Sequence, residues 1–202
     1  MLGCSTRHNL ENRSSQTLEI SWENRKPQTL EIALEKIQKQ AEIEVRKGVK
    51  QLILSDKNIS EKRLPIPMLL CVGAINTYLI KNKLRGYVSI NVQTGEALDT
   101  HSFATLLGVG ATTVNPYLAL DCLYQRFEKK LFGNFEYEDC IKRYIKSVNS
   151  GLLKIMSKMG ISVLSSYRGG CNFETVGLSR TVASEYFPCG EASHHRKTGF
   201  LP

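Results

Sequence analysis

Hydrophobic positions along the chain follow two periods, one typical of helices and one typical of strands. Apolar residues spaced three or four apart predict helices over residues 29–48, 67–83, 100–110, 116–130 and 137–159. Short apolar runs predict buried strands over residues 51–56, 87–93, 112–115 and 161–165. Strands that alternate with helices indicate an α/β fold with a mostly parallel sheet covered by helices.

The N-terminal region contains a near-duplicate, in which ENRSSQTLEI at residues 11–20 recurs as ENRKPQTLEI at residues 23–32. Two copies are too few for a solenoid, because a repeat array needs about three repeats to bury its faces. A local duplication at a terminus is the simpler interpretation. We therefore expect residues 1–26 to be poorly ordered.

Composition places the chain among globular proteins, with 202 residues, 42% hydrophobic and 23% charged. No run approaches the roughly 18 apolar residues of a membrane span, and the N-terminus lacks the apolar core of a secretory signal. A cytoplasmic location without membrane contact is the resulting prediction. The net charge is +8, but basic residues alternate with Glu as on solvated helix faces, so a nucleic-acid partner is not predicted.

Six cysteines are scattered without a CxxC pair, which favours buried, reduced thiols over a zinc or iron–sulfur site. His194 and His195 are adjacent in the tail but have no Cys or carboxylate at ligand spacing. No metal ligand is predicted.

Polar residues follow each predicted strand, where ligands bind in α/β folds. This pattern fits a functional rim, but most β-to-α loops are polar in any case. Glu96 and His101 lie after the second predicted strand and have the residue types of an acid–base pair. The favoured interpretation is structural, with Glu96 solvated or at a helix N-terminus and His101 in a local contact. No catalytic residue is assigned.

The run Ser166-Tyr167-Arg168-Gly169-Gly170 follows the fourth predicted strand. Its glycines would let backbone N–H groups approach an anion, and Arg168 is a bidentate donor. A strand-to-helix turn with a surface arginine is the favoured alternative. Lys158 stands at a helix C-terminus, where the dipole alone explains a cation. If a cofactor site exists, the predicted binding residues are Lys158, Ser166 and Arg168.

Several blocks resemble the large subunit of glutamate synthase, in the order of that family. They are LILSDKNIS (52–60), PIPMLLCVGAINTYLI (65–80), TGEALDTHSFATLLGVGATTVNPYLA (94–119), YIKSVNSGLLKIMSKMGIS (144–162), SYRGG (166–170), FETVGLS (173–179) and EYFP (185–188). The resemblance implies a long enzyme with a glutaminase domain, a central α/β domain, an FMN-binding (β/α)8 domain with a 3Fe–4S cluster, and a β-helix. That enzyme, an oxidoreductase, makes glutamate from glutamine-derived ammonia and 2-oxoglutarate.

Within this framework, residues 27–130 resemble the second half of the central domain and residues 131–188 the start of the FMN-binding domain. Residues 189–202 have no family likeness and are interpreted as a tail translated in another frame. The family's SYRGAQ motif reads SYRGGC at residues 166–171 of this chain, so that Gly170 replaces the alanine and Cys171 the glutamine. The expectation is a fragment, from a broken gene, without a complete active site. FMN and 3Fe–4S belong to the full-length family, and no cofactor is expected for this chain alone.

Two alternatives stay open at this point. In the first, the chain completes a split synthase in trans, with other glutamate synthase pieces as partners. In the second, it is a non-enzymatic α/β binding module that uses its basic surface. A flavin or iron–sulfur colour in the purified protein would reject the interpretation as an inactive fragment.

Overall fold

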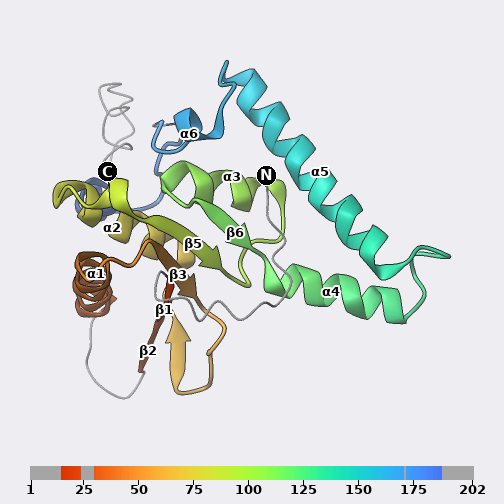
Figure 1. Ribbon diagram of the computed structural model, residues 1–202, viewed down its shortest axis with the longest axis horizontal. Helices are drawn as coiled ribbons and strands as arrows, with labels where there is room; N and C mark the ends of the chain where they lie inside the picture. The colour runs from red at the N-terminus through yellow and green to blue at the C-terminus, as the bar shows by residue number, and fades with distance from the viewer. Residues whose placement is uncertain (1–14, 24–29, 171, 188–202) are drawn as a thin grey trace.

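A four-stranded parallel sheet forms the centre of the molecule (Figure 1). The computed structural model describes residues 15–23, 30–170 and 172–187. The strands stand in the order β1 (Ser15–Glu19), β3 (Gln51–Ser55), β5 (Ser89–Gln93) and β6 (Thr113–Asn115). Their register places Leu18, Leu54, Val92 and Val114 in one row across the sheet. All four are buried, so this row is the centre of the core, and the predicted α/β class is confirmed.

Three helices pack side by side over this apolar face: α1 (Leu30–Arg46), α2 (Met68–Lys81) and α3 (Thr100–Val109). Each connects two parallel neighbours in a sheet whose strand order follows the sequence. Crossovers of the same right-handed kind therefore place all three helices on one face. None of the helices in the described ranges combines the length and apolar character needed to cross a membrane.

The opposite face of the sheet is polar and partly exposed. Thr17, Ile53, Asn91 and Thr113 form its central row, and the Thr113 hydroxyl donates to Asn91 Oδ1 at 2.7 Å. Such alternation is typical of a sheet covered on one side, whereas parallel sheets usually have helices on both. The predicted helical cover is thus confirmed for one face of the described sheet.

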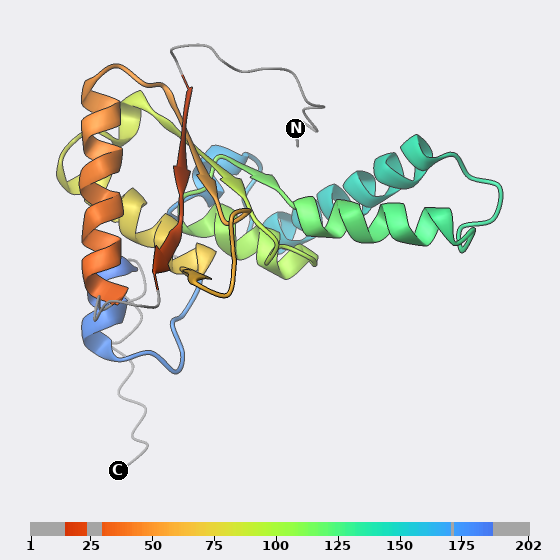
Figure 2. The same cartoon turned by 90° about the horizontal axis from the view of Figure 1, so that it is seen from below.

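A helical hairpin projects from the body (Figure 2). It consists of α4 (Tyr117–Glu128) and α5 (Tyr137–Lys158), and we call it the arm. The C-terminal half of α5 packs on α3, where Gly151 lies against Thr100. Only Ala119 of α4 is buried, so the distal part of the arm depends on contacts such as Phe127 with Tyr137, whose ring centroids are 5.6 Å apart.

Smaller elements complete the fold. They are β2 (Ser21–Glu23), which pairs antiparallel with β4 (Arg63–Pro65), the 3-10 helix η1 (Arg85–Tyr87), α6 (Leu164–Tyr167) and α7 (Arg180–Tyr186). The last helix packs on α2, where the Thr77 hydroxyl donates to the Tyr186 carbonyl at 3.2 Å.

Two sequence predictions need correction. Residues 161–165 do not form a strand: Gly160 ends α5 with φ 70°, and the chain then turns into α6, away from the sheet. Residues 15–23 of the segment expected to be poorly ordered form β1 and β2. There Leu18 and Ile20 enter the core with 1% and 0% of their surface exposed. Predictions for residues 1–14, 24–26 and 189–202 lie outside the described residues.

Candidate functional site

Asp56 is the hub of a buried polar network at the carboxyl edge of the sheet. It follows β3 directly and is 4% exposed. The Thr94 hydroxyl donates to Asp56 Oδ2 at 2.6 Å, and the Gly95 N–H lies 3.1 Å from the same oxygen. The hydroxyl of Tyr117, at the start of α4, also donates a hydrogen bond to the Asp56 carboxylate. Burial, the charge of Asp56 and this hydrogen bond raise the pKa of Tyr117 to about 12.

Glu96 extends the network to the next helix. Its Oε2 accepts a hydrogen bond from the N–H of Met68, the first residue of α2, at 3.0 Å. This is the position at which a carboxylate satisfies free N–H groups of a helix. Burial raises the pKa of Glu96, the Met68 N–H lowers it, and the negative charge of Asp56 raises it further.

His101 does not pair with Glu96. Its ring packs edge-on against Phe173, with the centroids 6.5 Å apart. Glu96 is held instead at the N-terminus of α2. The structural interpretation of both residues, which the sequence favoured over an acid–base pair, is therefore confirmed.

At the Ser166–Gly170 turn, the backbone N–H groups and the arginine side chain differ in whether they are free to bind an anion. The N–H groups of Arg168, Gly169 and Gly170 donate to the carbonyls of Leu164, Gly108 and Tyr167, at 3.1, 2.8 and 3.2 Å. The backbone amides of Arg168, Gly169 and Gly170 are thus occupied, which agrees with the turn that the sequence favoured over an anion site built on these amides. The Arg168 side chain remains: its Nε is buried and has no hydrogen-bond partner within the described residues.

The three residues predicted to bind a cofactor do not form one joined group. Lys158 is exposed at the end of α5, and Ser166 is exposed in α6. In the part of the chain that the structure describes, no hydrogen bond or ion pair joins Lys158 to Ser166 or Arg168. Their role in binding stays a prediction.

Arg85 is a residue that the sequence analysis missed. Its Nε donates to Asn76 Oδ1 at 2.7 Å, Nη1 to the Val88 carbonyl at 2.6 Å, and Nη2 to the Gly110 carbonyl at 2.8 Å. One guanidinium therefore joins α2, the start of β5 and the end of α3. An arginine in a polar stretch gives no sequence signal of this role, because two of its three acceptors, on Asn76 and Gly110, belong to α2 and to the end of α3.

The thiols and the amides of the Ser166–Gly170 turn bear on the FMN and 3Fe–4S cluster that the resemblance implies for the full-length family. Cys71 and Cys140 are buried free thiols, as predicted, whereas Cys122 is exposed. Within residues 15–23, 30–170 and 172–187 no three His, Cys, Asp or Glu side chains gather as metal ligands would. A flavin phosphate needs free donors, and the amides of Gly169 and Gly170 are already used. We therefore derive no step through FMN or an iron–sulfur cluster.

The fold and this edge define an α/β module with a one-sided parallel sheet and an internally bonded carboxyl edge. A family model described as the glutamate synthase central domain matches residues 4–179. The chain belongs to that family.

Curated relatives agree with this membership. The NADPH glutamate synthase large chain of Azospirillum brasilense is 51% identical over 155 residues, covering 77% of this chain and 10% of the relative. That of Bacillus subtilis is 46% identical over 154 residues, covering 76% and 10%. The chloroplastic ferredoxin-dependent glutamate synthase of Spinacia oleracea is 42% identical over 165 residues, again covering 76% and 10%.

The chain thus spans about a tenth of the length of these relatives. The central-domain match continues through residues 131–179, which the sequence analysis assigned to the start of the FMN-binding domain. Val148 and Met156 of α5 also belong to the same apolar core as the sheet. Neither the family match nor the shared core shows a domain boundary at residue 130. That boundary stays a prediction.

Proposed function

We propose that this chain serves glutamate synthesis as the central α/β module of a glutamate synthase large chain. In this role it is a structural part that positions other domains. The reaction of the larger protein, which joins glutamine-derived ammonia to 2-oxoglutarate with electrons from its cofactors, takes place outside the described residues. The family membership and the bonding at the carboxyl edge of the sheet support this proposal.

The Asp56 network carries the argument. Enzymes of this architecture place reactive side chains at the carboxyl ends of strands. Here Asp56 accepts from Thr94 and Gly95, and Glu96 accepts from the Met68 N–H. Each carboxylate is thus committed to the protein's own donors, and a general acid or base needs a proton-exchanging site toward substrate. The network therefore fixes loops rather than performing chemistry.

Two surfaces suit a module inside a larger protein. The polar face of the sheet has no helix over it among the described elements, although parallel sheets are usually covered on both sides. The arm exposes large apolar side chains near its turn, with Leu131 66% and Phe135 45% exposed. Apolar groups in such a projection gain stability when another part of a protein covers them.

A graft tests the proposal. The matching segment of the Azospirillum brasilense large chain is replaced by residues 30–170 of this chain, and flavin content and glutamate formation are measured. A structural module predicts a graft with full flavin content and glutamate formation within about threefold of the unmodified relative. Glutamate formation or a flavin spectrum from the isolated 202-residue chain would contradict the proposal, because either requires a site within it.

The exposed apolar residues of the arm also favour a second candidate, assembly in trans. Here the relative lacks the matching segment, and this chain is supplied as a separate polypeptide. Restored glutamate formation and co-purification would assign the chain to a split synthase. If the graft is active but the separate polypeptide restores no glutamate formation, assembly in trans is rejected. The module then works only as part of one continuous chain.

A further inference from the structure

The C-terminal end of α3 holds two arginines. Arg85 Nη2 donates to the Gly110 carbonyl at 2.8 Å. Gly169, the residue after Arg168, donates its N–H to the Gly108 carbonyl at 2.8 Å. The side chain of Arg85 and the backbone that follows Arg168 therefore bond to the same three-residue stretch, Gly108–Gly110, although the two arginines are far apart in sequence.

Neither guanidinium has a carboxylate partner in the described part of the chain. All three hydrogen bonds of Arg85 go to uncharged acceptors, namely an amide oxygen and two carbonyls. Arg168 makes no ion pair there, and its buried Nε has no acceptor. A buried donor without an acceptor costs free energy, and so do two like charges held together. Burial lowers the pKa of Arg85, and the positive charge of Arg168 lowers it further.

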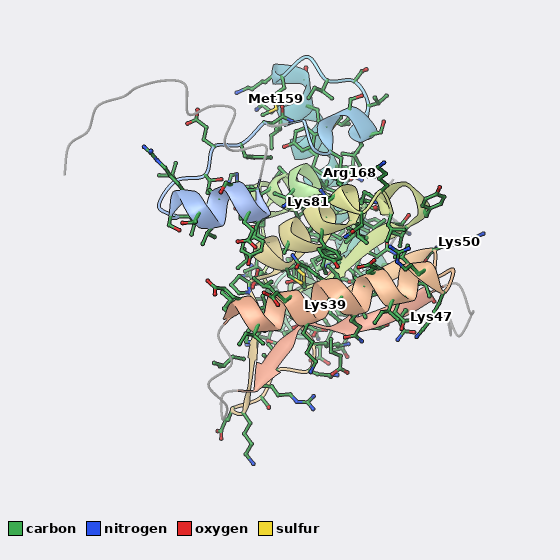
Figure 3. All side chains as sticks on the ribbon, turned by 90° about the vertical axis from the view of Figure 1, so that its left-hand side faces the viewer. Lys39, Lys47, Lys50, Lys81, Met159 and Arg168 are labelled. Atoms are coloured by element: carbon green, nitrogen blue, oxygen red, sulfur yellow. The ribbon has the colours of Figure 1, made fainter. Side chains whose placement is uncertain are left out.

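A purely structural role explains Arg85 but not Arg168. Cations are favourable at a helix C-terminus because they satisfy its last carbonyls. Arg85 already does so at Gly110. Arg168 is a second guanidinium near this end of α3, and its buried Nε has no acceptor among the described residues. Figure 3 shows Arg168 on the same side of the molecule as Lys50 and Lys81, which add to the positive potential of this side.

We propose that Arg168, beside Arg85, forms a binding site for an oxyanion, the shared chemistry of carboxylate and phosphate groups. The planar guanidinium of Arg168 binds two oxygens of such a group, and its Nε then gains the acceptor that it lacks. Arg85 contributes charge while it keeps its hydrogen bonds to the protein. The oxyanion comes either from solution or from an acidic side chain of a larger protein that contains this module.

Phosphate is the probe for the test on the full 202-residue chain. Thermal unfolding is followed with inorganic phosphate or with sodium chloride at the same ionic strength. For a millimolar site, about 10 mM phosphate raises Tm by roughly 3 °C over the chloride control. Arg168→Gln is expected to abolish this rise, and Arg168→Lys, which keeps the charge without the fork, to reduce it.

The matched control is Lys81→Gln, which removes one positive charge from the same side of the molecule. It is expected to keep most of the phosphate effect, because Lys81 adds only to the general positive potential and is not part of the arginine pair. Absence of any phosphate effect on the unmodified chain overturns the proposal. An equal effect in Arg168→Gln also overturns it, since phosphate then acts through general salt effects.

A binding measurement on the graft identifies the source of the oxyanion. Labelled phosphate bound per chain is compared between the graft and its Arg168→Gln variant. A loss of bound phosphate in the variant assigns the site to a free oxyanion. Equal binding in the two, together with the Tm effect in the isolated chain, assigns it to a carboxylate of the larger protein.

Discussion

The ring of Phe173 lies directly against the backbone of Gly108. A Cβ built on Gly108 would stand 2.3 Å from Cε2 of that ring, so only glycine permits this approach. Phe173 also meets Tyr167 edge-on, with the ring centroids 6.2 Å apart. Because Gly108 lies in α3 and Phe173 follows the Ser166–Gly170 turn, this contact attaches the C-terminal part of the described chain to the sheet layer.

Gly108→Ala is therefore expected to destabilise the protein. The methyl group forces Phe173 from its position, and overpacking of this kind costs about 1–3 kcal/mol, partly offset by the better helix propensity of alanine. Urea unfolding measures the change. Gly86→Ala is the control, since no atom lies within 4 Å of a Cβ at that position. Equal stability of the two variants would show that Phe173 does not depend on Gly108.

Asp56→Ala is expected to be among the most destabilising single changes. It leaves the Thr94 hydroxyl and the Gly95 N–H without their acceptor in a buried place. Loss of such an acceptor costs about 3 kcal/mol in the free energy of unfolding. Glu61→Gln, at an exposed position, is the control and is expected to stay within about 0.5 kcal/mol. If Asp56→Ala lowered the free energy of unfolding by less than the control does, Asp56 would not be the residue that holds this network together.

Tyr117 is expected to keep its proton well into the alkaline range. Burial and the Asp56 carboxylate raise its pKa to about 12, whereas an unfolded tyrosine titrates at about 10. Over this interval the unfolded chain loses a proton that the native chain retains. The contribution of Tyr117 to stability is therefore present below about pH 10 and is lost as the pH rises further.

The titration is measured by phenolate absorbance after rapid jumps to a series of pH values. The absorbance of Tyr117→Phe is subtracted from that of the unmodified protein, and the difference curve belongs to Tyr117. Asp56→Asn is expected to move the difference curve to lower pH, because it removes the negative charge beside the phenol. A curve that Asp56→Asn leaves in place would assign the shift to burial alone.

Arg85→Lys tests whether the shape of the guanidinium matters. A lysine keeps the charge but cannot reach Asn76, Val88 and Gly110 together in the fixed geometry of a fork. The expected loss is about 2–3 kcal/mol in the free energy of unfolding, since buried acceptors lose their donors. Lys83→Arg, at an exposed neighbouring position, is the matched control. A neutral result for Arg85→Lys would mean that charge alone suffices there.

Cysteine alkylation separates the thiols by their surroundings. Cys122 is exposed and is expected to react with iodoacetamide in the native protein. Cys71 is fully buried, and burial, together with the charge of Glu96, raises the pKa of its thiol to about 12. Peptide mapping by mass spectrometry after a short pulse reports both. In denaturant the two should react alike, and rapid native labelling of Cys71 would contradict its burial.

Local patterns in the sequence predict much of this fold. The helical spacing of Leu34, Ile37 and Ala41 predicts α1, and all three are buried. Asp99 has a side chain of the type favoured before a helix, and its carboxylate accepts from the Ser102 N–H at 2.9 Å. These features depend on residues within one or two helical turns, so the sequence contains the whole cause.

Features that depend on distant partners could not be predicted in this way. Residues 161–165 have the composition of a strand, yet a strand exists only where another offers its backbone, and the sheet lies elsewhere. Conversely, β1 forms in a stretch expected to lack order because β3 pairs with it and the core receives Leu18.

The sequence by itself determined the class of fold, the family, and the order of the main helices α1 to α5 and the strands β3, β5 and β6. The tertiary structure decided which polar groups are satisfied. Asp56 and Glu96 became parts of a bonded edge, whereas Arg168 kept a buried donor without an acceptor. The physical reason is that helix formation follows from neighbouring residues, whereas hydrogen-bond satisfaction in a core depends on groups that only folding brings together.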